Sequence, residues 1–196
     1  MQTSLPSTAP TSTDCADLQE LTSAVATAFS QRGWTLAVAE SCTGGLLAAS
    51  LTDLAGSSQW FERGYVTYSN AAKTACLHVS PILIEAEGAV SEAVARAMVL
   101  GAQLNSGVTA AISITGIAGP SGGTAGKPVG TVCFGWAVER VDASNHIMTT
   151  TAHFLGDRQS VRLQAVVFAL RGLLQSITLI EAINPTTLCA GNSSAE

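Results

Sequence analysis

The chain has 196 residues, which is enough for one domain with a single core and short ends. Charged residues make up only 12% of it, against roughly 25% in an average globular domain, so we expect another copy of the chain to cover part of the surface and predict a homo-oligomer. The net charge of −5 is spread along the chain without a basic stretch, which argues against nucleic acid as a partner.

The two ends of the chain differ in composition from its centre. Residues 1–16 are rich in Ser, Thr and Pro and have neither the positive nor the apolar stretch of a signal peptide, so we predict a disordered N-terminal tail. We expect the domain to span residues 17–182. The small, polar residues 183–196 are predicted to form a flexible C-terminal tail.

The first part of the domain predicts two rounds of helix and strand. Apolar residues recur at helical spacing over residues 17–32, where Asp17 is the expected N-cap and Gly33 the expected stop. A short apolar run over residues 34–39 predicts a strand, and residues 46–54 are again helix-like. A second strand is expected over residues 61–68, and a short helix opens at Asn70.

The next part adds a long helix, a buried strand and a glycine-rich loop. Ser91 is placed to cap a helix that runs to Leu104, and the continuous apolar run 108–115 is typical of a strand buried on both faces. Residues 116–130 hold too much Gly and Pro for regular structure, so we expect a long loop of the kind that often carries function.

The remaining residues predict a hairpin and a last helix. Strands over 131–138 and 147–154 are separated by polar residues, and a helix follows over 158–180. Its apolar stretch is interrupted by Arg171 and other polar residues, which indicates a buried helix and no membrane span. Together the elements predict a single three-layer α/β/α domain with a mixed sheet.

Three segments that follow predicted strands hold the candidate site residues, because ligands of α/β domains bind where strand ends meet loops. Their sequences are AESCTGG (39–45), TYSNAAK (67–73) and TGIAGPSGG (115–123).

Ser41 of the first segment is a candidate nucleophile. It lies between a strand and a glycine-containing helix start, where free backbone amides favour an oxyanion. The alternative is that Ser41 or Thr43 only caps the helix. Cys42 is the second candidate nucleophile, because a helix N-terminus would lower the pKa of its thiol. However, the three histidines of the chain form no pattern that identifies a Cys/His pair.

The second segment offers a base. A lysine can take a proton from serine only when it is neutral, which burial favours, and Lys73 follows an apolar strand. Tyr68 can relay a proton between Ser41 and Lys73 or hold the lysine in place. The alternatives are that Lys73 is an ordinary solvated side chain and that Tyr68 is an ordinary aromatic residue of a strand.

The third segment and the acidic residues complete the candidates. Backbone amides around Gly116 to Gly119 can line a phosphate or ribose pocket. The carboxylates show no metal-ligand spacing, so we predict neither a metal site nor a cofactor. Five cysteines without a CxxC pair argue against a disulfide framework and favour a cytoplasmic location.

The three segments, in this order, resemble the CinA C-terminal domain family. The similarity continues through residues 56–73, 88–98, 127–132 (KPVGTV) and 154–162 (FLGDRQSVR), and it spans roughly residues 17–180. Stand-alone members of this family are nicotinamide mononucleotide deamidases. The resemblance therefore implies hydrolysis of the carboxamide of nicotinamide mononucleotide, a small-molecule substrate, to nicotinic acid mononucleotide and ammonia.

The resemblance also implies site residues at matching positions. The serine of AESCTGG is Ser41, and the tyrosine and lysine of the second segment are Tyr68 and Lys73. A non-catalytic nucleotide-binding module of the same fold is the competing hypothesis, because a fold and glycine loops do not prove turnover. The residues expected to contribute to ligand binding are Cys42, Thr43, Gly44, Gly45, Thr115, Gly116 and Gly119.

Overall fold

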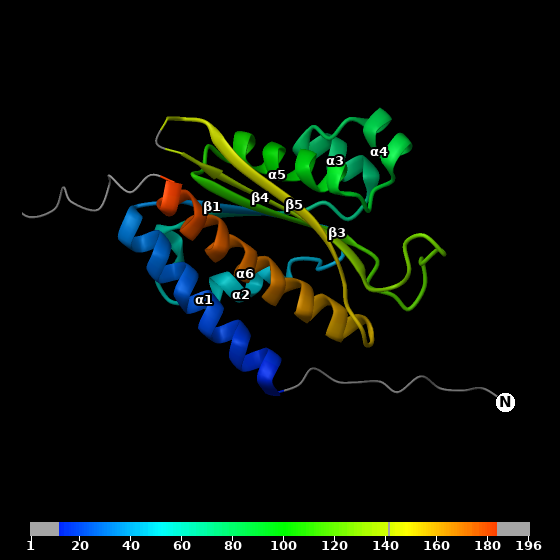
Figure 1. Cartoon of the computed structure of the whole chain (residues 1–196), viewed down its shortest axis with the longest axis horizontal. Helices are drawn as coiled ribbons and strands as arrows, with labels where there is room; N and C mark the ends of the chain where they lie inside the picture. The colour runs from blue at the N-terminus through cyan, green and yellow to red at the C-terminus, as the bar shows by residue number, and fades with distance from the viewer. Residues whose placement is uncertain (1–11, 141, 184–196) are drawn as a thin grey trace, which may run out of the picture.

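A five-stranded mixed sheet forms the centre of the domain (Figure 1). The computed structural model describes residues 12–140 and 142–183, and the strands lie in the order β2-β1-β3-β4-β5. Strand β1 is parallel to β2 and β3, whereas β3, β4 and β5 pair antiparallel, which confirms the mixed sheet and the C-terminal hairpin. The strands are β1 (Leu36–Glu40), β2 (Phe61–Val66), β3 (Ala110–Gly116), β4 (Thr131–Glu139) and β5 (Asn145–His153).

Helices cover both faces of the sheet, as the three-layer prediction requires (Figure 1). Successive side chains of a strand point to opposite faces. Accordingly Ile112 belongs to the core under α1 and α6, and its neighbour Ala111 to the core under α5. Helices α1 (Ser12–Arg32), α2 (Leu46–Thr52) and α6 (Arg158–Ile183) lie on one face, and α3 (Asn70–Leu77), α4 (Pro81–Glu87) and α5 (Glu92–Ser106) on the other.

Helix α1 differs from its prediction at the start. It begins at Ser12, so residues 12–16 are helical and Asp17 is not an N-cap. Instead the Asp17 carboxylate pairs with Arg171 of α6, against which α1 packs. The predicted stop is confirmed, because Gly33 adopts a φ of 62° and the Trp34 amide donates to the carbonyl of Phe29. The tail predictions for residues 1–11 and 184–196 lie outside the described residues, and the domain limits stay a prediction.

Helix α4 is absent from the sequence prediction, which left residues 78–90 unassigned. It has only seven residues, with Pro81 in its first turn and Gly88 as its C-cap. Proline near the start and glycine after the end are ordinary helix signals. The segment was missed because seven residues are too few to show a clear helical period.

Helix α6 is the main core helix. By length and composition alone it is apolar enough to cross a membrane, but 61% of its most apolar window is buried inside the domain. The indole N–H of Trp136 donates to the carbonyl of Ala169 at 2.8 Å, and a Cβ on Gly172 would lie 2.2 Å from the Trp136 ring. Glycine at this position therefore lets α6 lie directly on the sheet.

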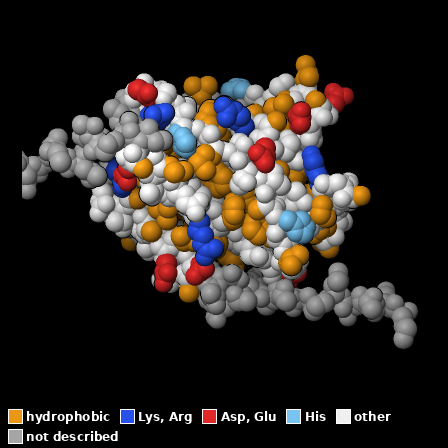
Figure 2. Space-filling view, in the orientation of Figure 1, with side chains coloured by type: hydrophobic (Ala, Val, Ile, Leu, Met, Phe, Trp, Pro, Cys, Tyr) orange, Lys and Arg blue, Asp and Glu red, His pale blue; other side chains and the backbone are white. Residues whose placement is uncertain are grey.

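The oligomeric state remains a prediction. The sheet and α1 cover α6 within one chain. The apolar residues around the circumference of this helix therefore do not by themselves require a second subunit. The prediction of an oligomer therefore rests on the low share of charged residues, and Figure 2 shows hydrophobic side chains exposed between charged ones on one face. We expect light scattering at micromolar concentration to give a multiple of the 20.0 kDa chain mass, and a monomer mass would contradict this.

Candidate active site

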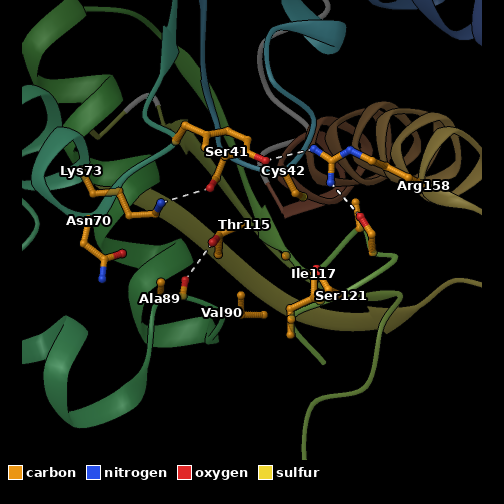
Figure 3. A pocket seen from close by; sticks show the side chains of 15 residues that line it. Ser41, Cys42, Asn70, Lys73, Ala89, Val90, Thr115, Ile117, Ser121 and Arg158 are labelled. Carbon is orange, nitrogen blue, oxygen red and sulfur yellow. Dashed lines mark hydrogen bonds between the residues drawn. The ribbon is translucent and has the colours of Figure 1, made fainter. Parts of the chain in front are cut away.

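A pocket of about 260 Å³ lies at the carboxyl ends of β1, β2 and β3 (Figure 3). These three strands are parallel, so the segments that follow them meet at one edge of the sheet. All three segments singled out in the sequence contribute to its wall. The lining residues are Ser41, Cys42, Tyr68, Asn70, Lys73, Ala89, Val90, Thr115, Gly116, Ile117, Ala118, Gly119, Ser121, Gly122 and Arg158.

Ser41 and Lys73 form a hydrogen-bonded pair in this pocket. The Lys73 Nζ lies 3.0 Å from the Ser41 Oγ and 2.9 Å from the carbonyl oxygen of Thr67 (Figure 3). Ser69 caps α3 by accepting the Ala72 amide, which places Lys73 in the first turn. The amide of Ser41 donates to the carbonyl of Ile114 at 2.9 Å, which ties the serine to the end of β3.

Lys73 is buried without a carboxylate partner. Its side chain is among the largest fully buried ones of the domain, and within the described residues Nζ contacts only a hydroxyl and a carbonyl oxygen. Burial lowers the pKa of Lys73, and the nearby Cys42 thiol has a smaller, opposite effect. The structure thus supplies the burial that a neutral lysine requires.

The carboxylate of Glu40 accepts hydrogen bonds from most of the backbone amides around the start of α2. Glu40 is the last residue of β1 and is fully buried, and its carboxylate accepts the amides of Gly45, Leu47 and Ala48 at 2.8–3.2 Å. Such charge-assisted hydrogen bonds are stronger than neutral ones. An anionic ligand therefore cannot use these three amides, which the sequence analysis did not foresee.

The amides of Cys42 and Thr43 remain available. The Gly44 amide donates to the carbonyl of Ser41 and the Leu46 amide to that of Thr43, so every other amide from residue 41 to 48 has a partner. Within the described part of the chain, those of Cys42 and Thr43 donate to no other residue. Cys42 directly follows Ser41 and lines the pocket, which is the position of one oxyanion donor in many serine hydrolases.

Cys42 departs from the expectation that a helix start lowers the pKa of its thiol. Burial raises that pKa to about 12, and the charge of Glu40 acts in the same direction. The reason is that α2 begins only at Leu46 and that Glu40 occupies its first amides. Cys42 as a whole is 5% exposed.

This environment predicts that Cys42 resists alkylation. At pH 8 a pKa of about 12 leaves on the order of 10⁻⁴ of the thiol as thiolate, the form that reacts. In the folded protein iodoacetamide should therefore label the exposed Cys76 and leave Cys42 unmodified, as peptide mass spectrometry can show. Labelling of both residues at equal rates would contradict the description of Cys42.

Tyr68 lies at the mouth of the pocket and contacts neither Ser41 nor Lys73 by a hydrogen bond. Its side chain is 60% exposed, and its hydroxyl lies 2.9 Å from a guanidinium nitrogen of Arg158. Arg158 also donates to the carbonyl of Gly119 at 2.9 Å (Figure 3). The geometry therefore places Tyr68 with Arg158 and offers no direct proton relay.

Three polar lining residues were not predicted from the sequence: Arg158, Asn70 and Ser121. Arg158 is the first residue of α6 and stands within FLGDRQSVR, so a cation directly after the last strand was the available signal. Asn70 and Ser121 lie inside the segments already selected, but their residue types alone gave no reason to single them out.

The residues expected to bind ligand divide into two groups. Cys42, Thr115, Gly116 and Gly119 line the pocket, whereas Thr43, Gly44 and Gly45 do not. The second group shapes the turn instead, because Gly44 and Gly45 have φ angles of 58° and 93° that favour glycine. Thr43 is fully buried, and Arg162 of α6 donates to its carbonyl at 2.6 Å.

Fold and site together define a three-layer α/β protein with a buried serine–lysine pair at the carboxyl edge of a mixed sheet. The chain belongs to the CinA C-terminal domain family, which it matches over residues 18–177.

Relatives and solved structures agree with this assignment. The nicotinamide-nucleotide amidohydrolases PncC of Enterobacter agglomerans and Escherichia coli K12 are 51% and 47% identical to the chain, and each comparison covers 81% of this chain and 94% of the relative. A crystal structure of a CinA superfamily protein from Klebsiella pneumoniae has a TM-score of 0.77 and 41% identity, over 83% of this chain and 98% of that one. The expected family and fold are thereby confirmed.

Proposed function

We propose that the protein hydrolyses the carboxamide of nicotinamide mononucleotide, with Ser41 as nucleophile and Lys73 as base. The observation that carries the proposal is the 3.0 Å hydrogen bond between the Ser41 Oγ and a buried lysine that has no acidic partner among the described residues. The amidohydrolase relatives, which span nearly the same length of chain, support the substrate.

The first half of the reaction forms an acyl-enzyme. Neutral Lys73 takes the hydroxyl proton of Ser41 while the Oγ forms a bond to the carboxamide carbon. The amide of Cys42, which lines the pocket, donates to the resulting oxyanion. Lys73 then passes its proton to the amide nitrogen, the C–N bond breaks, and ammonia leaves.

The second half releases the acid. A water molecule attacks the ester carbon, Lys73 takes one of its protons, and the bond to the Ser41 Oγ breaks as the serine is protonated again. The products are a carboxylate and free enzyme, so no electron transfer is required. The pyridinium ring of the substrate withdraws electrons and makes its carboxamide more electrophilic.

The cation at the pocket mouth suits a nucleotide substrate. Arg158 lies on the wall away from Lys73, where a phosphate monoester would lie if the carboxamide reached Ser41 (Figure 3). Its contacts to Tyr68 and Gly119 use two of its five N–H donors and hold the guanidinium in place. We therefore assign Tyr68 to positioning Arg158.

The proposal is tested by measuring ammonia release by the purified protein. Nicotinamide mononucleotide should be hydrolysed, whereas nicotinamide, which lacks the ribose phosphate, and the dinucleotide, whose phosphate is joined to an adenylate, should react far more slowly. Binding of the mononucleotide without ammonia release would favour a non-catalytic binding module. The cytoplasmic location stays a prediction, which cell fractionation can test.

Metal independence is a further expected result. Within residues 12–140 and 142–183 no group of three or more His, Cys, Asp or Glu side chains is placed to hold a metal ion, and the proposed steps use only the serine, the lysine and backbone amides. Ammonia release should therefore be unchanged by an excess of EDTA. Loss of activity in EDTA that returns on addition of a divalent metal would contradict the prediction.

A further inference from the structure

Lys127 is one of the two lysines of the chain and has no role in the proposed chemistry. It lies in the glycine-rich loop 117–130, on the return arm toward β4 (Figure 1). Its Nζ donates to the carbonyl oxygen of Glu87 at 2.9 Å. Glu87 is the last residue of α4, so this hydrogen bond joins the loop to a segment 40 residues away.

The two joined segments form two walls of the pocket. One wall is the outgoing arm of the loop, residues 117–122, and the other is the connection between α4 and α5 at Ala89 and Val90 (Figure 3). The second wall is anchored to the end of β3 by Thr115, whose hydroxyl donates to the carbonyl of Ala89 at 2.8 Å.

The two arms of the loop pack tightly on each other, which links Lys127 to the outgoing arm. A Cβ on Gly119 would lie 2.5 Å from the Val129 side chain, and one on Gly123 would lie 2.7 Å from the Val129 amide. Two hydrogen bonds between Thr124 and Lys127, at 2.9 and 3.1 Å, close the tip of the loop. The two arms are therefore held together by packing and hydrogen bonds.

The other end of the contact is equally restricted. Gly88 follows Glu87 with a φ of 78°, and a Cβ there would lie 3.4 Å from the Lys127 Nζ. Ser91 donates to the Gly88 carbonyl at 3.0 Å, which fixes the turn that leads into α5. The carbonyl at the end of α4 is thus presented to the lysine in one orientation.

We propose that Lys127 is a positioning residue that sets the distance between the two walls and so determines affinity for the part of the substrate remote from the carboxamide. The inference rests on the proposed function, because it takes this pocket as the substrate site. Ser41 directly follows β1, Lys73 belongs to α3, and neither is hydrogen-bonded to Lys127. Binding should therefore depend on Lys127 and the chemical step should not.

The test compares Lys127→Met with Lys127→Arg, which keeps a cationic donor, and with Arg63→Met, which removes an exposed positive charge from β2 as a matched control. For Lys127→Met we expect KM for nicotinamide mononucleotide to rise about tenfold with kcat within about threefold, as for loss of a charge-assisted hydrogen bond that supports binding alone. Lys127→Arg should restore most of the affinity, and Arg63→Met should match the wild type.

Amide hydrogen exchange gives a second readout that does not require activity. In Lys127→Met, the amides of residues 117–126 and 88–91 should exchange about tenfold faster, while those of β1 and α3 stay unchanged. If the wild type releases no ammonia but both walls exchange faster in the variant, the proposed function fails and the coupling of the walls stands. Unchanged exchange, or a fall in kcat at constant KM, would overturn the proposal for Lys127.

Discussion

Replacing Ser41 with alanine is expected to lower kcat for ammonia release by at least about 10³-fold, because removal of the nucleophile leaves only binding and the oxyanion donors. The fold should persist. The substitution removes one hydroxyl, and Lys73 keeps its hydrogen bond to the carbonyl of Thr67. The backbone amide of Ser41 still donates to Ile114.

Affinity separates this result from general damage to the site. Calorimetry should show that Ser41→Ala binds nicotinamide mononucleotide with nearly wild-type affinity. Ser121→Ala is the matched control, because it removes a serine hydroxyl from another wall of the same pocket, and its kcat should stay within about threefold of the wild type. Substantial turnover by Ser41→Ala would exclude Ser41 as the nucleophile.

Replacing Lys73 with methionine is expected to lower kcat by about 10²- to 10⁴-fold, the usual contribution of a general base. Lys73→Arg should fail as well, since a guanidinium stays protonated and cannot accept the serine proton. In the wild type, kcat/KM should rise with pH along a limb whose pKa lies below the ordinary value for lysine, because burial lowers the pKa of Lys73. Lys73→Met should lack this limb.

The same burial predicts a characteristic effect on stability. Since the pKa of Lys73 is lower in the folded state, the unfolded chain binds more protons between the folded and unfolded pKa values, and wild-type stability rises with pH across that window. At lower pH the wild type bears the cost of neutralising or burying the ammonium, so Lys73→Met should unfold at a denaturant concentration equal to or above that of the wild type near pH 7. This advantage should shrink as the pH approaches about 11.

Lys127→Met controls for loss of a lysine, because its side chain is partly exposed and donates to a single carbonyl. It should not reproduce the loss of kcat seen with Lys73→Met. A Lys73→Met variant with wild-type kcat, or one whose stability relative to the wild type does not change with pH, would contradict the description of Lys73 as a buried, neutral base.

The sequence predicted those parts of the fold that depend on local pattern. The five strands, the hairpin and the N-cap Ser91 are confirmed to within a few residues, because alternation, turn residues and caps are local signals. The predicted start of α1 was wrong, because the helix begins at Ser12 and Asp17, the expected N-cap, pairs with Arg171 of a distant helix. Such contacts between remote segments are not readable from one window of sequence.

The residues of the candidate site also divide into those predicted from local sequence and those whose partners are remote in the sequence. Ser41 and Lys73 were identified from short segments, and the topology of the parallel strands brings them together. Glu40 and Arg158 were not assigned their partners, because these lie in α2 and around Tyr68 and become visible only in three dimensions. The alternation along β1 already set the direction of the Glu40 side chain, but not what it would meet.

The central claim is that the serine, and not the adjacent cysteine, attacks the carboxamide. It is tested most directly by measuring ammonia release from nicotinamide mononucleotide by Ser41→Ala and Cys42→Ala side by side, with circular dichroism to confirm that both variants are folded. We predict that Cys42→Ala keeps most of the wild-type rate, since its thiol is protonated and buried, and that Ser41→Ala loses nearly all of it. An inactive Cys42→Ala beside an active Ser41→Ala would contradict the serine mechanism and assign the attack to a thiolate.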